Sequence, residues 1–386
     1  MRYAVGRQNR AARRSGSRWL TRVCWTAFGI GILMSISVLL ATSVYRNAGA
    51  ARISTEYQQF QGESGGVTST NKASADGFGQ APLPSPGTSK PGAGASDGNR
   101  NGKEIYINVY LTKEQRTERV SLENYVKGVL AGEMPADFEL EALKAQAIAA
   151  RTYIVRRLEL DDHSGMPATA AASRADVTDT IDHQMYISLD QLQVLWPKDE
   201  QKANLAKLDK AVSETRGEII TYSGEPIQAV FFSTSNGYTE NSEQYFQEEL
   251  PYLRSVASPW DKQISPRYEE TVKLALSDFY ARLGLATNKK PAIRVLDKTA
   301  GKRIADIMID GKTYTGREVR EKLGLASSQF TWKLDKDEIS ITTFGYGHGV
   351  GMSQWGANGM AEEGKSAEQI VTYYYTGTKV EQASKL

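Results

Sequence analysis

Cysteine and histidine are nearly absent from this chain of 386 residues. It has one cysteine, Cys24, and three histidines, His163, His183 and His348. A single thiol forms no internal disulfide and no structural zinc site of the usual thiolate kind. The H-E-x-x-H pattern of metal hydrolases is missing as well. The sequence therefore predicts no metal and no cofactor.

Acidic residues are absent from the first 46 residues, which contain eight arginines. Subtracting these eight charges from the formal charge of +2 leaves −6 for the rest of the chain. An acidic main body argues against nucleic acid as a partner.

Charged residues are also absent from residues 23–44, an apolar run of 22 that spans about 33 Å as a helix. We predict a single transmembrane helix here, with the seven arginines of residues 1–22 in the cytoplasm and the rest beyond the membrane. A cleaved signal is the alternative, because Asn47-Ala48-Gly49-Ala50 resembles a cleavage site. The anchor is preferred because the apolar core of a signal usually has only about 7–15 residues.

Residues 45–102 are rich in Gly, Ser, Ala and Pro and have no apolar periodicity. They predict a disordered linker with an r.m.s. span of about 40 Å. A tether of this length lets the following domain work away from the bilayer.

Residues 103–386 predict a mixed α+β domain outside the cytoplasm, with a small insert or second lobe at about 262–340. Strands are expected at 104–111, at 339–343, in a hairpin made of 218–222 and 227–232, and around 303–314. Beyond the two helices described next, helices are expected at 204–215, 276–283 and 317–323 and from Ser366, where Gln369 completes a capping box.

An acid at the end of a predicted helix is the main candidate for catalysis. Apolar residues recur with helical spacing from Leu122 to about Gly132, after Ser121 as a plausible N-cap. Glu133 continues that apolar stripe, and Met134-Pro135 ends the helix. Apolar surroundings and the negative end of the helix dipole both predict a raised pKa for this carboxyl.

A second helix is expected after Asp137, with Lys144 and Arg151 on one side near the turn. These cations are positioned to hold the acid or an anionic substrate. The alternative is a capped helical hairpin in which Glu133 is paired with Arg151.

Two further motifs suggest a binding surface. The segment Ser233–Glu240, STSNGYTE, follows a strand and offers hydroxyl and amide groups suited to sugars, or else forms an Asn-Gly turn with local caps. The segment Gly345–Gly356, GYGHGVGMSQWG, is expected to present His348 on a glycine-rich loop. It lacks the pattern of a phosphate loop, and no G-x-S-x-G elbow supports a serine triad with Ser233 or Ser235.

These motifs together closely resemble the stage II sporulation protein D family of endospore-forming bacteria. The resemblance covers about residues 105–380. It rests on EMPADFELEALKAQAIAARTY, on Asp176–Thr180 with Gln184-Met185-Tyr186, and on FFSTSNGYTE, PYLRSVASPWD and GYGHGVGMSQWGANGMA.

The resemblance implies a lytic transglycosylase that cleaves the glycan strands of peptidoglycan, preferring strands without stem peptides, during engulfment. It implies stage II sporulation proteins M and P as partners, Glu133 as the catalytic acid and Arg151 as a functional residue. Some relatives bind zinc through Cys and His. This chain has no cysteine near His163 and His183, so we predict no zinc.

From the chemistry of this reaction we expect Lys144 or Arg151 to hold the lactyl carboxylate of muramic acid. We expect Ser235, Asn236, Tyr238, His348 and Gln354 to line the sugar groove. The hairpin of Glu133 and the two motifs should converge there, with Glu133 within about 15 Å of one or both motifs. The alternative from another class is a scaffold that binds the wall and recruits an amidase without cutting glycan.

Overall fold

The computed structural model describes residues 104–169, 174–246, 248–286 and 290–383. The mixed α+β class is confirmed in these residues. The predicted cytoplasmic segment, the transmembrane helix, the whole linker and residue 103 of the predicted domain lie outside them. Within the described ranges, no helix is both long enough and apolar enough to cross a membrane.

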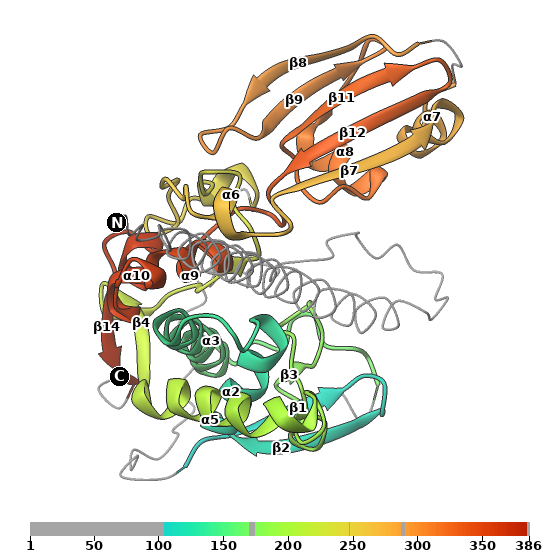
Figure 1. Cartoon of the computed structure of the whole chain (residues 1–386). Helices are drawn as coiled ribbons and strands as arrows, with labels where there is room; N and C mark the ends of the chain where they lie inside the picture. Colours follow the sequence, from blue (N-terminus) through green and yellow to red (C-terminus); the bar gives the residue numbers. More distant parts are fainter. Residues whose placement is uncertain (1–103, 170–173, 247, 287–289, 384–386) are drawn as a thin grey trace, which may run out of the picture. The chain divides into compact units, whose positions relative to one another are not determined.

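The elements carry the labels of Figure 1. In chain order they are β1 (Tyr106–Leu111), β2 (Arg116–Ser121), α2 (Leu122–Glu133), α3 (Leu140–Glu159), β3 (Val177–Thr178), α4 (Leu189–Leu192), α5 (Lys198–Glu214), β4 (Glu218–Tyr222), β5 (Glu225–Pro226), β6 (Phe231–Phe232), η2 (Ser242–Gln244), α6 (Asp261–Ile264), β7 (Glu269–Ala275), α7 (Leu276–Leu283), β8 (Ile293–Lys298), β9 (Ile304–Ile309), β10 (Lys312–Thr315), α8 (Gly316–Leu323), β11 (Phe330–Asp335), β12 (Glu338–Phe344), β13 (Met352–Ser353), α9 (Gln354–Glu362), α10 (Ala367–Tyr374) and β14 (Lys379–Gln382).

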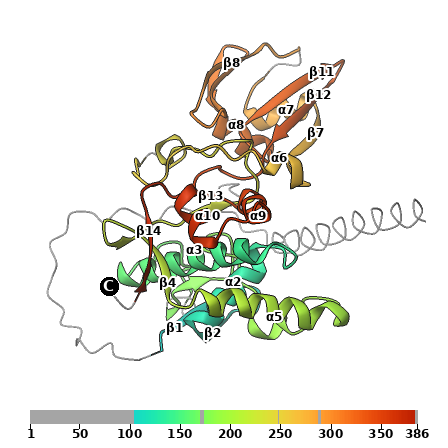
Figure 2. The ribbon, with the colours of Figure 1, turned by 60° about the vertical axis from the view of Figure 1, so that its left-hand side comes forward.

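Helix α3 is the centre of the main hydrophobic core. It contacts α2, α5, α9, α10 and β4, which surround it in Figures 1 and 2. Its alanines Ala145, Ala147, Ala149 and Ala150 have no exposed surface. Small side chains let neighbouring elements approach α3 closely on several sides. The N-cap of α3 is Glu139 and not the expected Asp137, which is exposed.

The strands form small sheets in the orders β2-β1-β3, β14-β4-β5, β13-β6, β11-β12-β7 and β10-β9-β8. The predicted hairpin is correct in its first strand and its turn, but its second strand, expected at 227–232, is wrong. Strand β4 pairs with the short β5, whereas β6 pairs in parallel with β13, so that Phe231 faces Met352. This parallel pair joins the Ser233–Glu240 segment to the glycine-rich segment, although about 120 residues separate them.

Residues 269–344, here called the β7–β12 region, have a hydrophobic cluster of their own. It is formed by side chains of β7, α7, β9, β10, α8, β11 and β12. Helix α7 has the predicted bounds and α8 starts one residue early. Both helices end at a left-handed glycine, Gly284 or Gly324. These are the C-terminal signals that mark short helices well in a sequence.

Helix α2 contains two glycines on the face that packs against residues 185–187. Gly128 and Gly132 lie one turn apart and allow the backbone of residues 185–187 to lie directly on the helix, where Ile187 N–H donates to Gly128 O at 3.1 Å. A Cβ atom at Gly128 would overlap the Tyr186 ring and lie 2.6 Å from Ile187 O. The close packing of this segment therefore requires glycine.

Gly128→Ala should destabilise the protein by about 1–3 kcal/mol, although Ala normally favours a helix by about 1 kcal/mol over Gly. The reason is that the added methyl group meets backbone, which cannot move aside like a flexible side chain. Urea unfolding measures the effect, and Asn124→Ala on the same helix is the control because Asn already has a Cβ. A stabilised Gly128→Ala protein would contradict this packing.

Candidate active site

Glu133 is the last residue of α2, and its half-buried carboxyl lies between two neutral donors. Met185 N–H donates to Oε1 at 2.9 Å, and the Gln354 side-chain amide donates to Oε2 at 3.3 Å. Glu133 forms no ion pair with any described residue. The alternative in which Glu133 is paired with Arg151 is therefore wrong, and two hydrogen bonds hold the carboxyl.

Burial raises the pKa of Glu133 to about 7, and the two hydrogen bonds oppose this rise without cancelling it. The direction is the one predicted from the apolar stripe. A carboxyl with this pKa is present in both protonation states near neutral pH. It can therefore donate a proton and also take one up.

The loop after Glu133 is attached to α9. The Phe138 ring packs edge-on against Trp355 with centroids 4.7 Å apart, and Glu139 N–H donates to Asn358 Oδ1 at 2.7 Å. Gln354, the first residue of α9, contacts Glu133 itself. The predicted convergence of the helical hairpin with the glycine-rich motif is confirmed.

Asp261 joins the two predicted binding motifs, a role that the sequence did not reveal. Its buried carboxylate accepts hydrogen bonds from Ser235 N–H at 2.7 Å, from Ser235 Oγ and from Ser258 Oγ, and from Ser353 Oγ. Burial raises its pKa despite these donors. Ser353 is also the N-cap of α9, so Asp261 fixes the start of the helix that carries Gln354.

Ser235 is completely buried in these contacts. A side chain without exposed surface cannot touch a glycan, so its predicted place in the groove is wrong in this structure. Asn236 is 7% exposed and its amide donates to Gly301 O at 2.8 Å and to Gln329 Oε1. Tyr238 is 41% exposed. A sugar contact of Asn236 or Tyr238 remains a prediction.

His348 is buried and not presented as expected. Its ring centroid lies 5.3–5.7 Å from those of Phe232, Tyr245 and Phe246, and its Nδ1 accepts from Val350 N–H at 3.0 Å. Burial and nearby arginines lower its pKa to about 3, so the ring is neutral. The aromatic residues that enclose it come from distant parts of the chain, which is why the local glycine pattern suggested exposure.

Arg151 has no exposed surface and forms structural contacts. Its guanidinium donates twice to Glu123, at 3.1 and 2.6 Å, and to Glu218 O at 3.1 Å. The expectation that Arg151 holds the glycan is therefore wrong in this structure. It instead joins α2, α3 and β4 around the core.

Lys144 is half-buried and pairs with Glu141 at 2.7 Å and with Glu214 at 2.5 Å. These carboxylates raise its pKa against the effect of burial. The pair with Glu141 lies within α3, whereas the pair with Glu214 links α3 to α5. Contact of Lys144 with substrate remains a prediction.

The other two histidines, His163 and His183, do not form a metal site in this conformation. His183 Nδ1 contacts Thr178 and its Nε2 contacts Ser164 O at 3.1 Å, while burial lowers its pKa to about 4. His163 is exposed beside Asp161. In the part of the chain that the structure describes, three His, Cys, Asp or Glu residues never gather as metal ligands would.

Residues 110–222, which include Glu133 and Met185, match the family model described as "Stage II sporulation protein". The chain is 48% identical to stage II sporulation protein D of Bacillus subtilis (strain 168) over 280 residues, which is 72% of this chain and 80% of that protein. The chain belongs to the stage II sporulation protein D family. Gln354 and Asp261 lie outside residues 110–222, the range that the family model matches.

Two further relatives are similar to this chain. Stage II sporulation protein D of Bacillus amyloliquefaciens is 46% identical over 280 residues, 72% of this chain and 79% of that protein. A protein named "Amidase enhancer" from Bacillus subtilis (strain 168) is 28% identical over 307 residues, which is 66% of this chain but 40% of that protein.

Glu123→Gln should lower the free energy of unfolding by about 3–5 kcal/mol, because the guanidinium of Arg151 then remains buried without a counter-ion. Chemical denaturation measures this loss. Glu214→Gln is the matched control, since it removes an exposed partner of Lys144 and should change stability little. Equal effects of the two substitutions would contradict the structural role of Arg151.

The raised pKa of Glu133 also predicts a pH-dependent stability. In the folded state Glu133 titrates at about 7, against 4.5 in the unfolded chain. Below pH 4.5 the protonated carboxyl stabilises the folded state by about 3 kcal/mol. This contribution is lost as the pH rises from 4.5 through 7. Glu133→Gln cannot titrate and should not lose this stability. The free energy of unfolding of the variant should therefore rise relative to that of the wild type between about pH 5 and 8. Stability curves that stay parallel across this range would exclude the raised pKa.

Proposed function

We propose that this protein is a peptidoglycan lytic transglycosylase that cleaves glycan strands lacking stem peptides, during wall remodelling in sporulation. Membership of the stage II sporulation protein D family supports the sporulation role. The observation that carries the activity is the state of Glu133, a carboxyl with a pKa of about 7 that is held by two neutral donors.

A single group of this kind suits a reaction that consumes no water. Protonated Glu133 gives its proton to the glycosidic oxygen as the bond from that oxygen to C1 of the muramic acid breaks. The carboxylate then takes the proton of the C6 hydroxyl while O6 bonds to C1, which forms a 1,6-anhydro ring. The proton is returned to Glu133, so the enzyme needs no second carboxylate as a hydrolase does.

The two donors give the carboxyl oxygens different roles. Met185 N–H can only donate, so it favours a lone pair on Oε1. The longer contact of Oε2 is made by a side-chain amide, which can present either its NH₂ group or its oxygen. We therefore assign the transferable proton to Oε2, with Gln354 as its positioning residue.

We further propose that residues 23–44 anchor the protein in the cell membrane. The linker then connects this anchor to the catalytic domain, which acts outside the membrane. Stage II sporulation proteins M and P are the partners that the family resemblance suggests. The acidic charge after Arg46 supports a partner other than nucleic acid.

The second candidate function is a scaffold that binds the wall and activates an amidase. It is favoured by the relative named "Amidase enhancer". The state of Glu133 separates the two functions. A scaffold has no use for a carboxyl that changes protonation near neutral pH, and its binding should not depend on one.

Glu133→Gln should lower glycan cleavage by at least 10²- to 10⁴-fold, because one group serves as both acid and base. The assay incubates peptide-free glycan strands with the full-length protein and measures 1,6-anhydromuramyl ends by mass spectrometry. Glycan binding and folding should persist, because the neutral amide has nearly the shape of the carboxyl.

Glu139→Gln is the matched control, since Glu139 is an exposed carboxyl in the loop that follows the acid. It should cleave at the wild-type rate. A folded Glu133→Gln protein that forms anhydro ends as fast as wild type would rule out the mechanism. Wild-type protein that binds strands but releases none of these ends would favour the scaffold.

A further inference from the structure

A cation of the β7–β12 region lies beside the exposed aromatic ring of the Ser233–Glu240 segment. Lys302 is exposed, and its ammonium lies 5.8 Å from the centroid of the Tyr238 ring. Tyr238 leaves 41% of its surface open. No carboxylate among the described residues pairs with Lys302, so its charge is available to a ligand.

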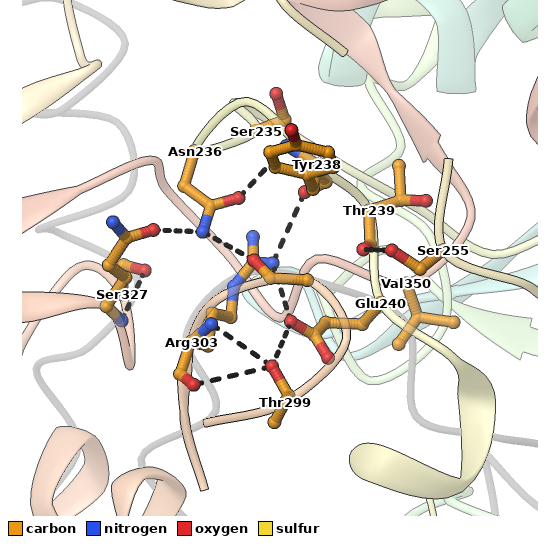
Figure 3. Close-up of polar contacts among 12 residues, drawn as sticks. Ser235, Asn236, Tyr238, Thr239, Glu240, Ser255, Thr299, Arg303, Ser327 and Val350 are labelled. Atoms are coloured by element: carbon orange, nitrogen blue, oxygen red, sulfur yellow. Dashed lines mark hydrogen bonds and ion pairs between the residues drawn. The ribbon is translucent and has the colours of Figure 1, made fainter. Parts of the chain in front are cut away.

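Buried contacts hold this pair of side chains in place. The guanidinium of Arg303 donates to Glu240 Oε1 at 3.1 Å, and Thr299 Oγ1 donates to the same oxygen at 2.7 Å. Arg303 and Glu240 have at most 2% of their surface exposed. Figure 3 shows these residues joining the Thr299–Arg303 loop to the segment that carries Tyr238.

The loop approaches so closely because Gly301 lacks a side chain. A Cβ atom there would overlap the carboxylate of Glu240. The Gly301 carbonyl instead accepts from the Asn236 amide at 2.8 Å. Lys302 follows in a left-handed conformation with φ of 67°, and its N–H closes a turn on Thr299 O at 3.0 Å. The position of Lys302 beside Tyr238 thus follows from the buried contacts of its neighbours.

A partly exposed aromatic ring with an unpaired ammonium over it suits a sugar that carries a carboxylate. The ring offers an apolar surface to the C–H face of the sugar, while the ammonium attracts the acid group. We propose that Tyr238 and Lys302 form a subsite that recognises a sugar residue with a free carboxylate. Resting on the proposed function, this residue is a muramic acid whose lactyl group bears no peptide, since an amide link removes the negative charge.

The chain contains a matched pair that lacks the open ring. Lys312 lies 4.8 Å from the centroid of Tyr314 in the same region, but Tyr314 is 3% exposed and its hydroxyl donates to Leu283 O. Lys312 therefore serves as a control, because it has the same charge as Lys302 but lies next to a buried tyrosine ring.

The test measures binding by full-length protein carrying Glu133→Gln, so that strands are not consumed. The probes are peptide-free glycan strands and the same strands with their carboxyls converted to methylamides. We expect a preference of roughly 2- to 5-fold for the free carboxylates, which weakens at about 0.5 M salt. Lys302→Gln should abolish the preference, whereas Lys302→Arg and Lys312→Gln should retain it. Tyr238→Ala should weaken binding of both probes.

A preference that survives Lys302→Gln unchanged, or that Lys312→Gln abolishes equally, would overturn the subsite. Binding of both probes that survives Tyr238→Ala would do the same. Failure of the proposed function has a different signature, namely wild-type protein that forms no 1,6-anhydro ends. Because the subsite is read by binding and the reaction by products, each can fail while the other stands.

Discussion

The close contact between α2 and residues 185–187 determines the chemical state of Glu133. Gly128 and Gly132 let backbone lie on the helix, and that backbone supplies the Met185 N–H that holds the carboxyl. Burial raises the pKa of this carboxyl to about 7, although the hydrogen bond from Met185 opposes the rise. A larger residue at either glycine would separate the helix from the segment. The loss of contact would then affect packing, orientation and acidity together.

Buried polar groups connect the segments around this acid. Asp261 ties the Ser233–Glu240 segment to the start of α9, and Arg303 with Glu240 ties it to the β7–β12 region. Such groups contribute less to stability than apolar residues of similar volume often do, because burying a charge carries a desolvation cost. We regard their role here as one of register, since each contact is directional and joins loops that lack long strand pairing.

The local patterns of the chain were good guides to helices. Apolar spacing predicted α2 and the direction in which Glu133 projects, and the capping box at Ser366 and Gln369 marked the start of α10. Both signals involve residues within about four positions of each other, so local sequence contains them. The i, i+4 glycines of α2 were also visible, but the segment that lies on them comes more than 50 residues later.

The sequence by itself determined the fold class, the helix that carries Glu133, and the family through its ordered motifs. Only the tertiary structure decided which polar residues meet. Arg151 pairs with Glu123 and not with Glu133. His348 is enclosed by three aromatic rings, and the Ser235 hydroxyl donates a hydrogen bond to Asp261. These outcomes depend on contacts between residues far apart in the chain, and the burial that shifts a pKa or closes off a side chain arises only when those segments pack together.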